Sequence, residues 1–372
     1  MFIKMMVQAL AEGLQSVTRA IAARPIKPIL EGVLIETDED GVYLTCTDSL
    51  LTIRTFVPAK VNTPGKTALP GKILTELIRK LPEGPVEIKI NEKNSASIKC
   101  LSSRTNLACL PHQEFPQIIL DEQEIVYSLP QNTFRDMIQK VIFAISSDDT
   151  RQILTGCLLE ISGDEVRLVC LDGFRLALQR HPAAFSLPKG TDRVSAVIPG
   201  KNMAEIGKIL SDNDNPIQFS FDKTRLYAAI GDTRVSSVLL AGEYINYRQI
   251  LPADWMIRAT VNCQIFESAL ERASLMAREG KNNRNLLKLS ITAEDMTITS
   301  AAEMGDVREV LPIMAEGGEI EIAFNANYLK DVIRNVSDEE VSMRFNSNVS
   351  PCVICPVQGD GFLYLVLPIR VY

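Results

Sequence analysis

The chain has 372 residues, of which 46% are hydrophobic, 23% charged and 6% aromatic. This length is too great for one hydrophobic core and suits two or three domains of about 100–150 residues, while the balanced composition excludes a disordered chain. A net charge of −7 and a pI near 5.2 argue against binding to nucleic acid or membranes by simple electrostatic adhesion.

Two further features bear on where the protein works. The chain begins without a long apolar core or a small-residue cleavage site, and it has no run of about 18 apolar residues, so we expect a cytoplasmic protein that does not enter membranes. Its eight cysteines are scattered, mostly within apolar strand-like runs, which is typical of small buried side chains in a reducing compartment rather than of a disulfide framework.

Helical periodicity appears first at residues 7–21. The apolar positions recur every three or four residues: Val7, Leu10, Leu14, Val17 and Ile21. Strand-like runs follow at 33–36 and 42–47, with a turn at 38–41 between them. Residues 68–81 then read as a strand end, a turn and a short amphipathic helix. This first stretch predicts two helices against antiparallel strands.

The same order of elements returns twice. Longer helices are predicted at residues 134–145 and 266–277, and the segment of strand end, turn and short helix recurs at 197–210 and 323–336. A constant offset of 124 pairs Leu10 with Phe134 and Asp48 with Asp172, and it grows to 132 in the third copy, which places an insertion of about eight residues at 278–284. We therefore predict an α+β chain of three tandem repeats, with domains at 1–122, 123–252 and 253–372.

Basic residues recur on the outer faces of these predicted helices. In the short helix of the first repeat, the apolar stripe leaves Lys72, Arg79 and Lys80 outside. Similar positions elsewhere are held by Arg135, Lys140, Lys201, Lys208, Arg272, Lys330 and Arg334. Most surface lysines and arginines are simply solvated, but repetition over three units favours the alternative of one basic surface inside an acidic protein.

The sequence displays no catalytic motif. His112 and His181 have no partner nucleophile or carboxylate at a recognisable spacing. Cys352 and Cys355 resemble half of a zinc site, but on a strand this spacing directs the two thiols to opposite faces, and no second pair is present. We expect a protein without catalytic residues, metal or cofactor.

Two segments depart from the repeat. Where the first repeat has Asp48-Ser-Leu-Leu-Thr52, the second has Asp172-Gly-Phe-Arg-Leu176, so we expect the second turn to be peculiar to its repeat. The chain also ends in an apolar run, Leu365-Val-Leu-Pro-Ile-Arg-Val-Tyr372. A last core strand and part of a groove for an extended peptide both fit this run.

Taken together, these features resemble the bacterial sliding clamp family, the β subunit of DNA polymerase III. The resemblance covers the whole chain and is carried by the three repeats and by residues 171–176 (Leu-Asp-Gly-Phe-Arg-Leu), 246–252 (Asn-Tyr-Arg-Gln-Ile-Leu-Pro), 324–328 (Phe-Asn-Ala-Asn-Tyr) and 367–370 (Leu-Pro-Ile-Arg). It implies a head-to-tail homodimer of three-domain subunits that closes into a ring around double-stranded DNA. Such a ring holds DNA by topology and needs only weak, sequence-independent phosphate contacts, which reconciles DNA binding with an acidic chain.

The resemblance also implies site residues, matched position by position. The implied groove takes short linear motifs from the replicative polymerase catalytic subunit, the clamp loader, repair polymerases and mismatch-repair proteins. Its residues are Leu154, Leu171, Gly173, Phe174, Arg175, Leu176, Ile245, Ile250, Asn325, Tyr328, Val349, Leu365, Leu367, Pro368, Ile369 and Arg370. The implied DNA contacts are Arg24, Lys72, Arg79, Lys80, Arg151, Lys201, Arg278, Lys281, Arg284 and Arg334, and the implied dimer contacts are Leu107, Leu275 and Met276.

The chain departs from the family pattern at Leu171, Phe174, Ile245 and Pro351, where Thr, His, Pro and Ser are commoner, so the groove has more apolar walls. An alternative function is a clamp-like interaction scaffold that keeps the groove but does not encircle DNA. A strict monomer in solution would favour that scaffold. An enzyme would need a reactive site that the sequence does not display.

Overall fold

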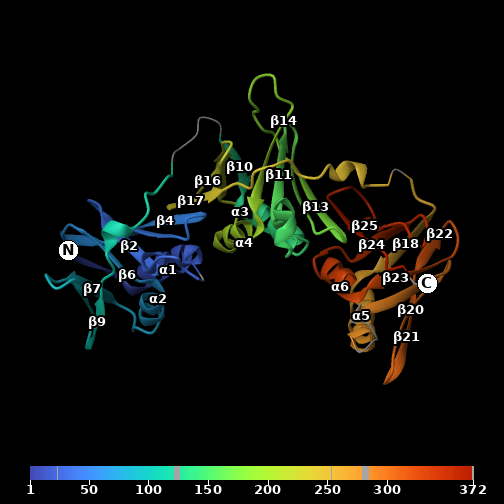
Figure 1. Ribbon diagram of the computed structural model, residues 1–372, viewed down its shortest axis with the longest axis horizontal. Coiled ribbons are helices and arrows are strands. Elements are labelled where there is room, and N and C mark those ends of the chain that lie inside the picture. Colours follow the sequence, from blue (N-terminus) through green and yellow to red (C-terminus); the bar gives the residue numbers. More distant parts are fainter. Residues whose placement is uncertain (23, 121–125, 253, 279–284, 371–372) are drawn as a thin grey trace. The chain divides into compact units, whose positions relative to one another are not determined.

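The computed structural model describes residues 1–22, 24–120, 126–252, 254–278 and 285–370. Within these ranges the α-helices are α1 (Val7–Val17), α2 (Gly71–Arg79), α3 (Gln131–Ile142), α4 (Gly200–Ile209), α5 (Cys263–Arg278) and α6 (Ala326–Arg334) (Figure 1). All other regular elements are β-strands and short 3₁₀ turns, so the predicted α+β class is confirmed. Among the described residues, no helix combines the length and the apolarity needed to cross a membrane.

The chain divides into two compact units that do not coincide with the three repeats. Unit 1 comprises Met1–Arg135 and Glu205–Leu239, and unit 2 comprises Asp136–Ala204 and Leu240–Tyr372. The middle repeat is shared between them because its strands join the sheets of its neighbours. The predicted boundaries at 122/123 and 252/253 fall at or beside residues outside the described ranges, and they stay predictions.

Unit 1 contains a five-stranded and an eight-stranded antiparallel sheet. In the order of hydrogen-bonded neighbours, the first is β5 (Lys60–Thr63), β1 (Phe2–Met6), β7 (Pro85–Ile90), β8 (Ser95–Cys100) and β9 (Ser103–Ala108). The second is β10 (Tyr127–Pro130), β15 (Pro216–Phe221), β16 (Arg225–Ile230), β17 (Thr233–Val238), β4 (Leu51–Pro58), β3 (Gly41–Thr47), β2 (Gly32–Thr37) and β6 (Lys66–Pro70). Strand β17 of the second repeat pairs with β4 of the first, with Thr233 opposite Thr55.

Unit 2 repeats this plan with a nine-stranded and a four-stranded antiparallel sheet. The larger is β14 (Arg193–Pro199), β11 (Gly156–Ser162), β12 (Glu165–Leu171), β13 (Arg175–Pro182), β26 (Phe362–Val366), β25 (Cys352–Pro356), β24 (Glu340–Phe345), β18 (Ile257–Asn262) and β22 (Met314–Glu316). The smaller is β21 (Gly305–Pro312), β20 (Asp295–Ala302), β19 (Leu286–Ile291) and β23 (Ile320–Asn325). Here β13 of the second repeat pairs with β26 of the third, with Leu176 opposite Leu365.

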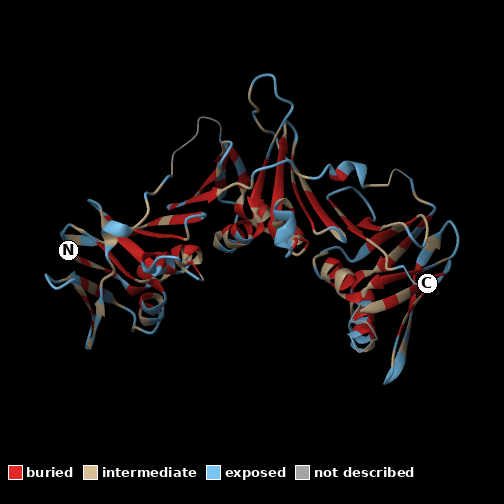
Figure 2. Ribbon diagram, viewed as in Figure 1, coloured by how far each residue is buried: buried red, intermediate tan, exposed pale blue. Residues whose placement is uncertain are grey.

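The helices bury apolar stripes, with Leu10 and Leu14 of α1 and Leu74 and Ile78 of α2 among the buried residues. Figure 2 shows buried residues gathered in the strands of the sheets and exposed residues in the connecting loops. Helix α1 ends at Val17, four residues before the predicted Ile21. The Thr18 hydroxyl donates to the Leu14 carbonyl (2.7 Å), and a 3₁₀ turn follows. Helix α3 likewise ends before Ile145, at Ile142, so the apolar periodicity runs past the true helix ends.

Candidate peptide-binding groove and basic helix faces

One carboxylate holds the turn between β12 and β13. Asp172 Oδ1 accepts hydrogen bonds from the backbone N–H groups of Phe174 (2.8 Å) and Arg175 (2.9 Å). Gly173, between them, has a φ of +92°, a left-handed conformation that glycine adopts without steric conflict. This turn holds Phe174 at the surface, where the residue is 58% exposed.

The first repeat has the same turn, so the expectation that the turn is peculiar to the second repeat is wrong for the backbone. Asp48 Oδ1 accepts from the N–H groups of Leu50 (3.0 Å) and Leu51 (2.8 Å), and Ser49 has a φ of +79°. The two turns also share a backbone hydrogen bond to a neighbouring segment. The Leu50 carbonyl accepts from Val238 N at 2.8 Å, and the Phe174 carbonyl accepts from Leu367 N at 2.8 Å. The difference between the repeats lies in their side chains.

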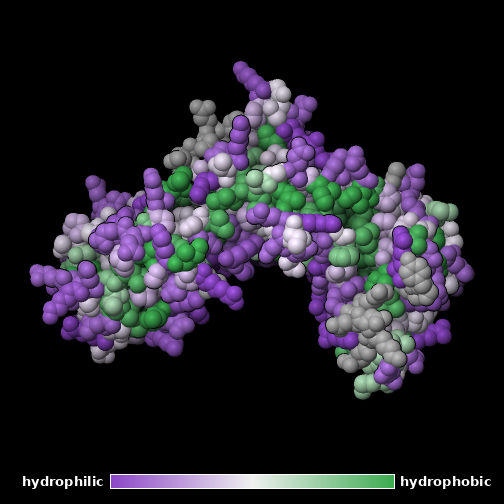
Figure 3. Space-filling model, viewed as in Figure 1, coloured by the Kyte–Doolittle hydropathy of each residue, from purple (hydrophilic) through white to green (hydrophobic). Residues whose placement is uncertain are grey.

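Both repeats have an apolar cluster beside this turn, since Leu30 and Leu34 of the first repeat are buried where the second has Leu154 and Leu158, but the two clusters differ in size and in their polar members. The residues of the first repeat that correspond to Leu171 and Leu176 are Thr47 and Thr52, whose hydroxyls are buried and 2.9 Å apart. In unit 2 the corresponding region has a buried floor: Leu154, Leu158, Val169, Leu171, Leu176, Leu178, Val197, Tyr247, Val353 and Leu365. Hydrophobic side chains gather over the region of β13 and β25 (Figure 3). The apolar floor of the groove therefore lies where β13 pairs with β26.

The predicted groove residues all lie in unit 2, at three levels of burial. Buried in the floor are Leu154, Leu171, Leu176 and Leu365. Half-buried are Arg175, Asn325, Tyr328, Leu367, Pro368 and Ile369. Exposed are Gly173, Phe174, Ile245, Ile250, Val349 and Arg370. The exposed hydrophobic residues above an apolar floor are what an extended peptide needs for its side chains.

The C-terminal run is fixed along this region by its backbone. Leu367 N donates to the Phe174 carbonyl (2.8 Å) and Ile369 N donates to the Ala323 carbonyl (2.7 Å). A depression of about 520 Å³ lies beside the run and is lined in part by Val349, Ile369 and Arg370. The run is therefore more than a last core strand, since β26 ends at Val366 and the residues after it border open space.

Two aromatic rings and a guanidinium pack together beside the turn. The rings of Phe174 and Tyr328 are stacked with centroids 6.0 Å apart, and the Arg175 guanidinium lies 4.8 Å from the centre of the Tyr328 ring. Burial raises the pKa of Tyr328, and the charge of Asp172 raises it further, so the phenol stays neutral at physiological pH. Asn325 is the N-cap of α6, and its side chain accepts from Asn327 N at 2.9 Å.

Sequence reasoning missed several residues that pack on the apolar floor. They come mostly from the segment before β18: Tyr244, Tyr247, Leu251 and Trp255. Residues 246–252 of this segment carry part of the resemblance, but Ile250 is the one side chain among them that was predicted to line the groove. Their aromatic and aliphatic character was the available signal.

The residues predicted to contact DNA are mostly exposed, but they differ in their surroundings. Exposed positions are Arg24, Lys72, Arg79, Lys80, Arg151, Lys201, Arg278 and Arg334, while Lys281 and Arg284 lie outside the described residues. Among described residues, none forms an ion pair with Lys72, Arg79 or Lys80. Arg334, by contrast, pairs with Glu267 (3.2 Å) and Glu271 (2.5 Å) of α5.

Arg151 lies close to the groove turn. A Cβ atom placed on Gly173 would be 3.8 Å from Arg151 Nη1. Arg151 also has a non-helical backbone, with φ −115° and ψ +66°, inside the 3₁₀ segment Asp149–Thr155. A residue predicted to contact DNA therefore neighbours a residue predicted to contact peptides.

Lys330 was expected on an outer helix face, and this expectation is wrong. Its side chain is buried between α5 and α6, and Nζ donates to Ser274 Oγ at 3.2 Å. Burial lowers the pKa of Lys330, and the positive charges of Arg278 and Arg334 lower it further. Four other outer-face residues pair with acids: Arg135 with Asp212, Lys140 with Asp136, Lys208 with Glu205 and Arg272 with Glu309.

The predicted dimer contacts lie on surfaces of different units. Leu107 is half-buried on β9, an edge strand of the five-stranded sheet in unit 1. Leu275 is 58% exposed and Met276 is half-buried on α5 of unit 2. The four-stranded sheet of unit 2 also ends in an edge strand, β21. Edge strands present unpaired backbone groups that can extend a sheet into another chain.

The two cysteines that resembled half a zinc site lie in β25 and are buried. Burial raises the pKa of both Cys352 and Cys355, which favours neutral thiols over the thiolates that bind metal. Among the described residues, no three His, Cys, Asp or Glu side chains gather in a way that could hold a metal ion.

Comparison with known proteins gives matches over the whole chain. Family models of the DNA polymerase III beta subunit match in order: the N-terminal domain at residues 1–119, the central domain at 128–246 and the C-terminal domain at 248–370. The beta sliding clamps of Halalkalibacterium halodurans and Bacillus subtilis are 32% and 31% identical, and each alignment covers at least 97% of both chains. The crystal structure of the Bacillus subtilis clamp aligns over 100% of both chains with a TM-score of 0.94 and 30% identity. The Thermotoga maritima β subunit aligns with a TM-score of 0.93 and 26% identity.

Proposed function

Because the chain belongs to the DNA polymerase III β subunit family, the β sliding clamps, it is a non-catalytic processivity factor, and we propose that two copies close head to tail into a ring around duplex DNA. The match to all three clamp domains carries this proposal. The free edges of β9 in unit 1 and β21 in unit 2 support it, since a head-to-tail ring joins different surfaces of the two copies. Leu107 on β9 and Leu275 with Met276 on α5 would contribute apolar contacts there.

The proposed DNA contacts are weak and independent of sequence. Exposed basic residues on helices of both units, such as Lys72 and Lys201, would meet phosphates inside the ring together with Arg24, Arg79, Lys80, Arg151, Arg278, Lys281, Arg284 and Arg334. Many neighbouring basic groups are already paired with acids. Such a surface suits a clamp held by topology, because tight static binding would prevent sliding.

The proposed partner site is the apolar groove of unit 2. An extended linear motif would place its apolar side chains on the floor around Leu176 and Leu365, beside the exposed ring of Phe174. The partners would be the replicative polymerase catalytic subunit, the clamp loader, repair polymerases and mismatch-repair proteins, in the cytoplasm.

Retention on DNA tests the ring. The clamp, loaded onto a nicked circular duplex by its clamp loader, should remain bound through gel filtration and should be lost once the circle is cut by a restriction enzyme. Equal retention on circular and linear DNA would reject topological binding. A strict monomer at micromolar concentration would instead favour the interaction scaffold that does not encircle DNA.

A separate experiment tests the groove. Leu176→Ala combined with removal of residues 367–372 should abolish binding of a polymerase-derived peptide in fluorescence polarisation and leave the dimer intact in sedimentation. Thr52→Ala, at the corresponding position of the first repeat, is the matched control and should bind the peptide like the unaltered protein. Undiminished affinity in the Leu176 variant would remove the groove assignment.

A further inference from the structure

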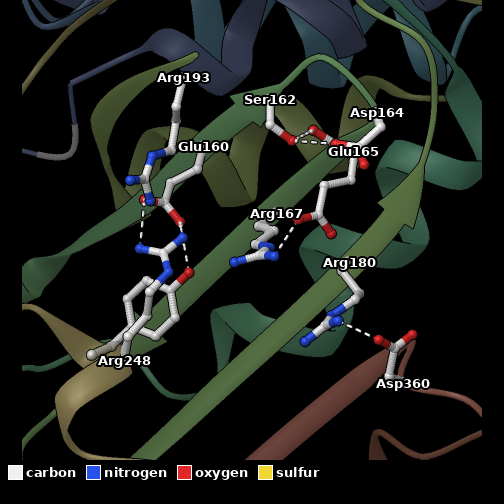
Figure 4. A network of polar contacts seen from close by, with 10 residues as sticks. Glu160, Ser162, Asp164, Glu165, Arg167, Arg180, Arg193, Arg248 and Asp360 are labelled. Carbon is white, nitrogen blue, oxygen red and sulfur yellow. Dashed lines mark hydrogen bonds and ion pairs between the residues drawn. The ribbon is translucent and has the colours of Figure 1, made fainter.

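One face of the nine-stranded sheet changes from apolar to charged along its strands. On β11, Leu158 belongs to the apolar floor, and the next residue on the same face is Glu160. On β12, Val169 belongs to the floor, and the next residue on that face is Arg167, which lies opposite Glu160 in the register. Figure 4 shows the charged part of this face, where side chains from β11, β12, β13, β14 and the segment before β18 come together.

Glu160 is the centre of the charged part. Its Oε2 accepts from the Tyr247 hydroxyl (2.6 Å) and from Arg248 Nη2 (2.7 Å), and its Oε1 accepts from Arg248 Nη1 (3.2 Å) and Arg193 Nη1 (3.3 Å). Its side chain is only 9% exposed. Both carboxylate oxygens are therefore fully occupied, and one buried negative charge holds two arginines in place.

The two arginines keep unused hydrogen-bond donors. The side chain of Arg193 is 48% exposed and that of Arg248 is 39% exposed, and each guanidinium has N–H groups that Glu160 does not take. Together with Glu160 they line a pocket of about 290 Å³, to which Arg167 and Asp192 also contribute. Glu165 also lines the pocket, so its three arginines are balanced by three carboxylates, and what the pocket offers an anion is the unused N–H groups of Arg193 and Arg248.

The charged pocket and the apolar floor are physically continuous. Tyr247 connects them, because its ring packs in the floor and its hydroxyl binds Glu160. Neighbouring positions on one face of a strand are about 7 Å apart, so four residues of an extended peptide, about 13 Å, span the distance from the level of Leu158 to that of Ser162. A peptide bound on the floor can therefore reach the pocket with its flank.

We propose that the pocket around Arg193 and Arg248 is a subsite that binds a carboxylate side chain of a partner, on the segment flanking the apolar motif. The inference rests on the proposed function of the groove. A carboxylate fits because it can accept two parallel N–H bonds from a guanidinium. Ion pairing of Arg167 with Glu165 leaves Arg193 and Arg248 as the principal donors, while Asp192 on the rim weakens the attraction.

The test uses the full-length protein and fluorescein-labelled peptides that carry the clamp-binding segment of the host's replicative polymerase. Each peptide has a pair of glutamates, or a pair of glutamines as its control, four residues beyond the apolar motif at its amino or its carboxyl end. In fluorescence polarisation at low salt, one glutamate peptide should bind about three- to five-fold more tightly than its glutamine control, as one partly exposed ion pair allows. High salt should remove this gain.

Three variants test whether the tighter binding of the glutamate peptide depends on this pocket. Arg193→Gln should abolish the preference for glutamate and leave the affinity for the glutamine peptide unchanged, while Asp192→Asn should increase the preference. Arg234→Gln removes the same charge from β17 of unit 1 and should change neither. Thermal unfolding of the Arg193 variant should lie only slightly below that of the unaltered protein, because Glu160 keeps its hydrogen bonds from Tyr247 and Arg248.

The possible outcomes distinguish a failure of the carboxylate subsite from a failure of the groove proposal on which it rests. If both peptides bind equally and the Arg193 variant behaves like the unaltered protein, the subsite is overturned while the groove stands. If no peptide binds, the groove proposal fails and takes the subsite with it. If Arg193→Gln weakens binding of linear duplex DNA and leaves every peptide affinity unchanged, the pocket binds phosphate, which also overturns the carboxylate proposal.

Discussion

Arg175 was predicted to contact peptides, yet its guanidinium is directed into the protein. Nε donates to Asp172 (3.0 Å), Nη1 to Asp331 of α6 (2.5 Å) and Nη2 to the Phe143 carbonyl (2.8 Å). Its side chain is 11% exposed. These contacts join the turn that carries Phe174 to a helix of the third repeat, so Arg175 acts on the groove by positioning it.

Replacing Arg175 with lysine tests whether its positive charge alone, or its planar hydrogen-bonding geometry, positions the turn. Lysine keeps the positive charge but has no planar fork that can serve three acceptors at once, so Arg175→Lys should lower the free energy of unfolding by about 1–3 kcal/mol. Urea unfolding measures this, and fluorescence polarisation should show weaker peptide binding. Arg180→Lys is the control, because Arg180 pairs with the exposed Asp360 and should have little effect. Equal effects of the two variants would contradict the positioning role.

Glu160 predicts a pH effect on stability. Burial by itself would raise the pKa of Glu160, but hydrogen bonds from Arg248 and Tyr247 and the charges of Arg248 and Arg193 outweigh it, so the pKa lies below its ordinary value of 4.5. A carboxyl with a lowered pKa in the folded protein contributes stability that is present above pH 4.5 and is lost as the pH falls through the folded-state value.

Glu160→Gln should therefore flatten the acid limb of the stability curve. The variant should be less stable at neutral pH by about 1–3 kcal/mol, since Arg193 and Arg248 lose their partner, and this difference should shrink below pH 4.5. Urea unfolding over a pH series measures both quantities. Glu319→Gln, at an exposed position of the same unit, is the control. A difference that stays constant with pH would refute the assignment.

At the scale of elements, the first two repeats share a contact between an isoleucine just beyond the longer helix and the first residue of the shorter helix. A Cβ on Gly71, the first residue of α2, would overlap Ile21 Cδ1, and a Cβ on Gly200, the first residue of α4, would overlap Ile145 Cδ1. The third repeat has Ala326 in place of the glycine and, at the offset of 132, Ala277 in place of the isoleucine. Its helix α5 also continues to Arg278. In the third repeat the residue at the start of the shorter helix is larger, alanine in place of glycine, and the residue at the end of the longer helix is smaller, alanine in place of isoleucine.

This complementarity predicts a coupled pair of mutations in unit 2. Gly200→Ala alone should lower the free energy of unfolding by about 1–3 kcal/mol, because the new methyl group enters space occupied by Ile145. Ile145→Val removes Cδ1 and should restore part of that loss in the double variant. Urea unfolding of the four proteins gives the coupling energy. Gly163→Ala is the control, since a Cβ there meets no atom within 4 Å, and strictly additive effects would contradict the packing argument.

The sequence predicted the helices and the repeat but not how the sheets are joined. Helical periodicity located α1, α3 and α5, although it continued past Val17 because Ile21 is apolar for another reason, its contact with Gly71. Which strand pairs with which is a long-range property that no local pattern records. The pairing of β4 with β17 and of β13 with β26, which makes the compact units differ from the repeats, was therefore not predicted.

The candidate site was predicted only in part, because several of its contacts join side chains that are distant in the sequence. The floor residues Leu154, Leu171, Leu176 and Leu365 were predicted from the resemblance to the clamp family, and the departure of the Asp172–Leu176 turn from the repeat pointed to the same region. The direction of Arg175, the burial of Lys330 and the network around Glu160 depend on side chains from distant segments. Such contacts have no signature in a single sequence, because each partner alone resembles an ordinary surface charge.

For the whole molecule, the balance of charge on the helix faces is the property that bears on sliding. Arg334 at the end of α6 is paired with two glutamates of α5, and Arg272 is paired with Glu309. The pairs of Arg334 reduce the positive charge at a proposed DNA contact, and the pair of Arg272 does the same on an outer helix face nearby in the sequence. Fewer phosphate contacts favour movement along DNA, because each additional contact increases the static affinity and its dependence on salt.

Removing the two glutamates that hold Arg334 should make the clamp bind DNA more tightly and slide more slowly. Glu267→Gln with Glu271→Gln frees one guanidinium, so the slope of log affinity against log salt for linear duplex should steepen by about one unit. Single-molecule tracking of the loaded ring should show a smaller diffusion coefficient at low salt. Glu316→Gln with Glu319→Gln changes the net charge equally at exposed positions around the end of β22, away from Arg334. If both pairs of substitutions change affinity alike, net charge governs DNA binding, and Arg334 has no place among the DNA contacts.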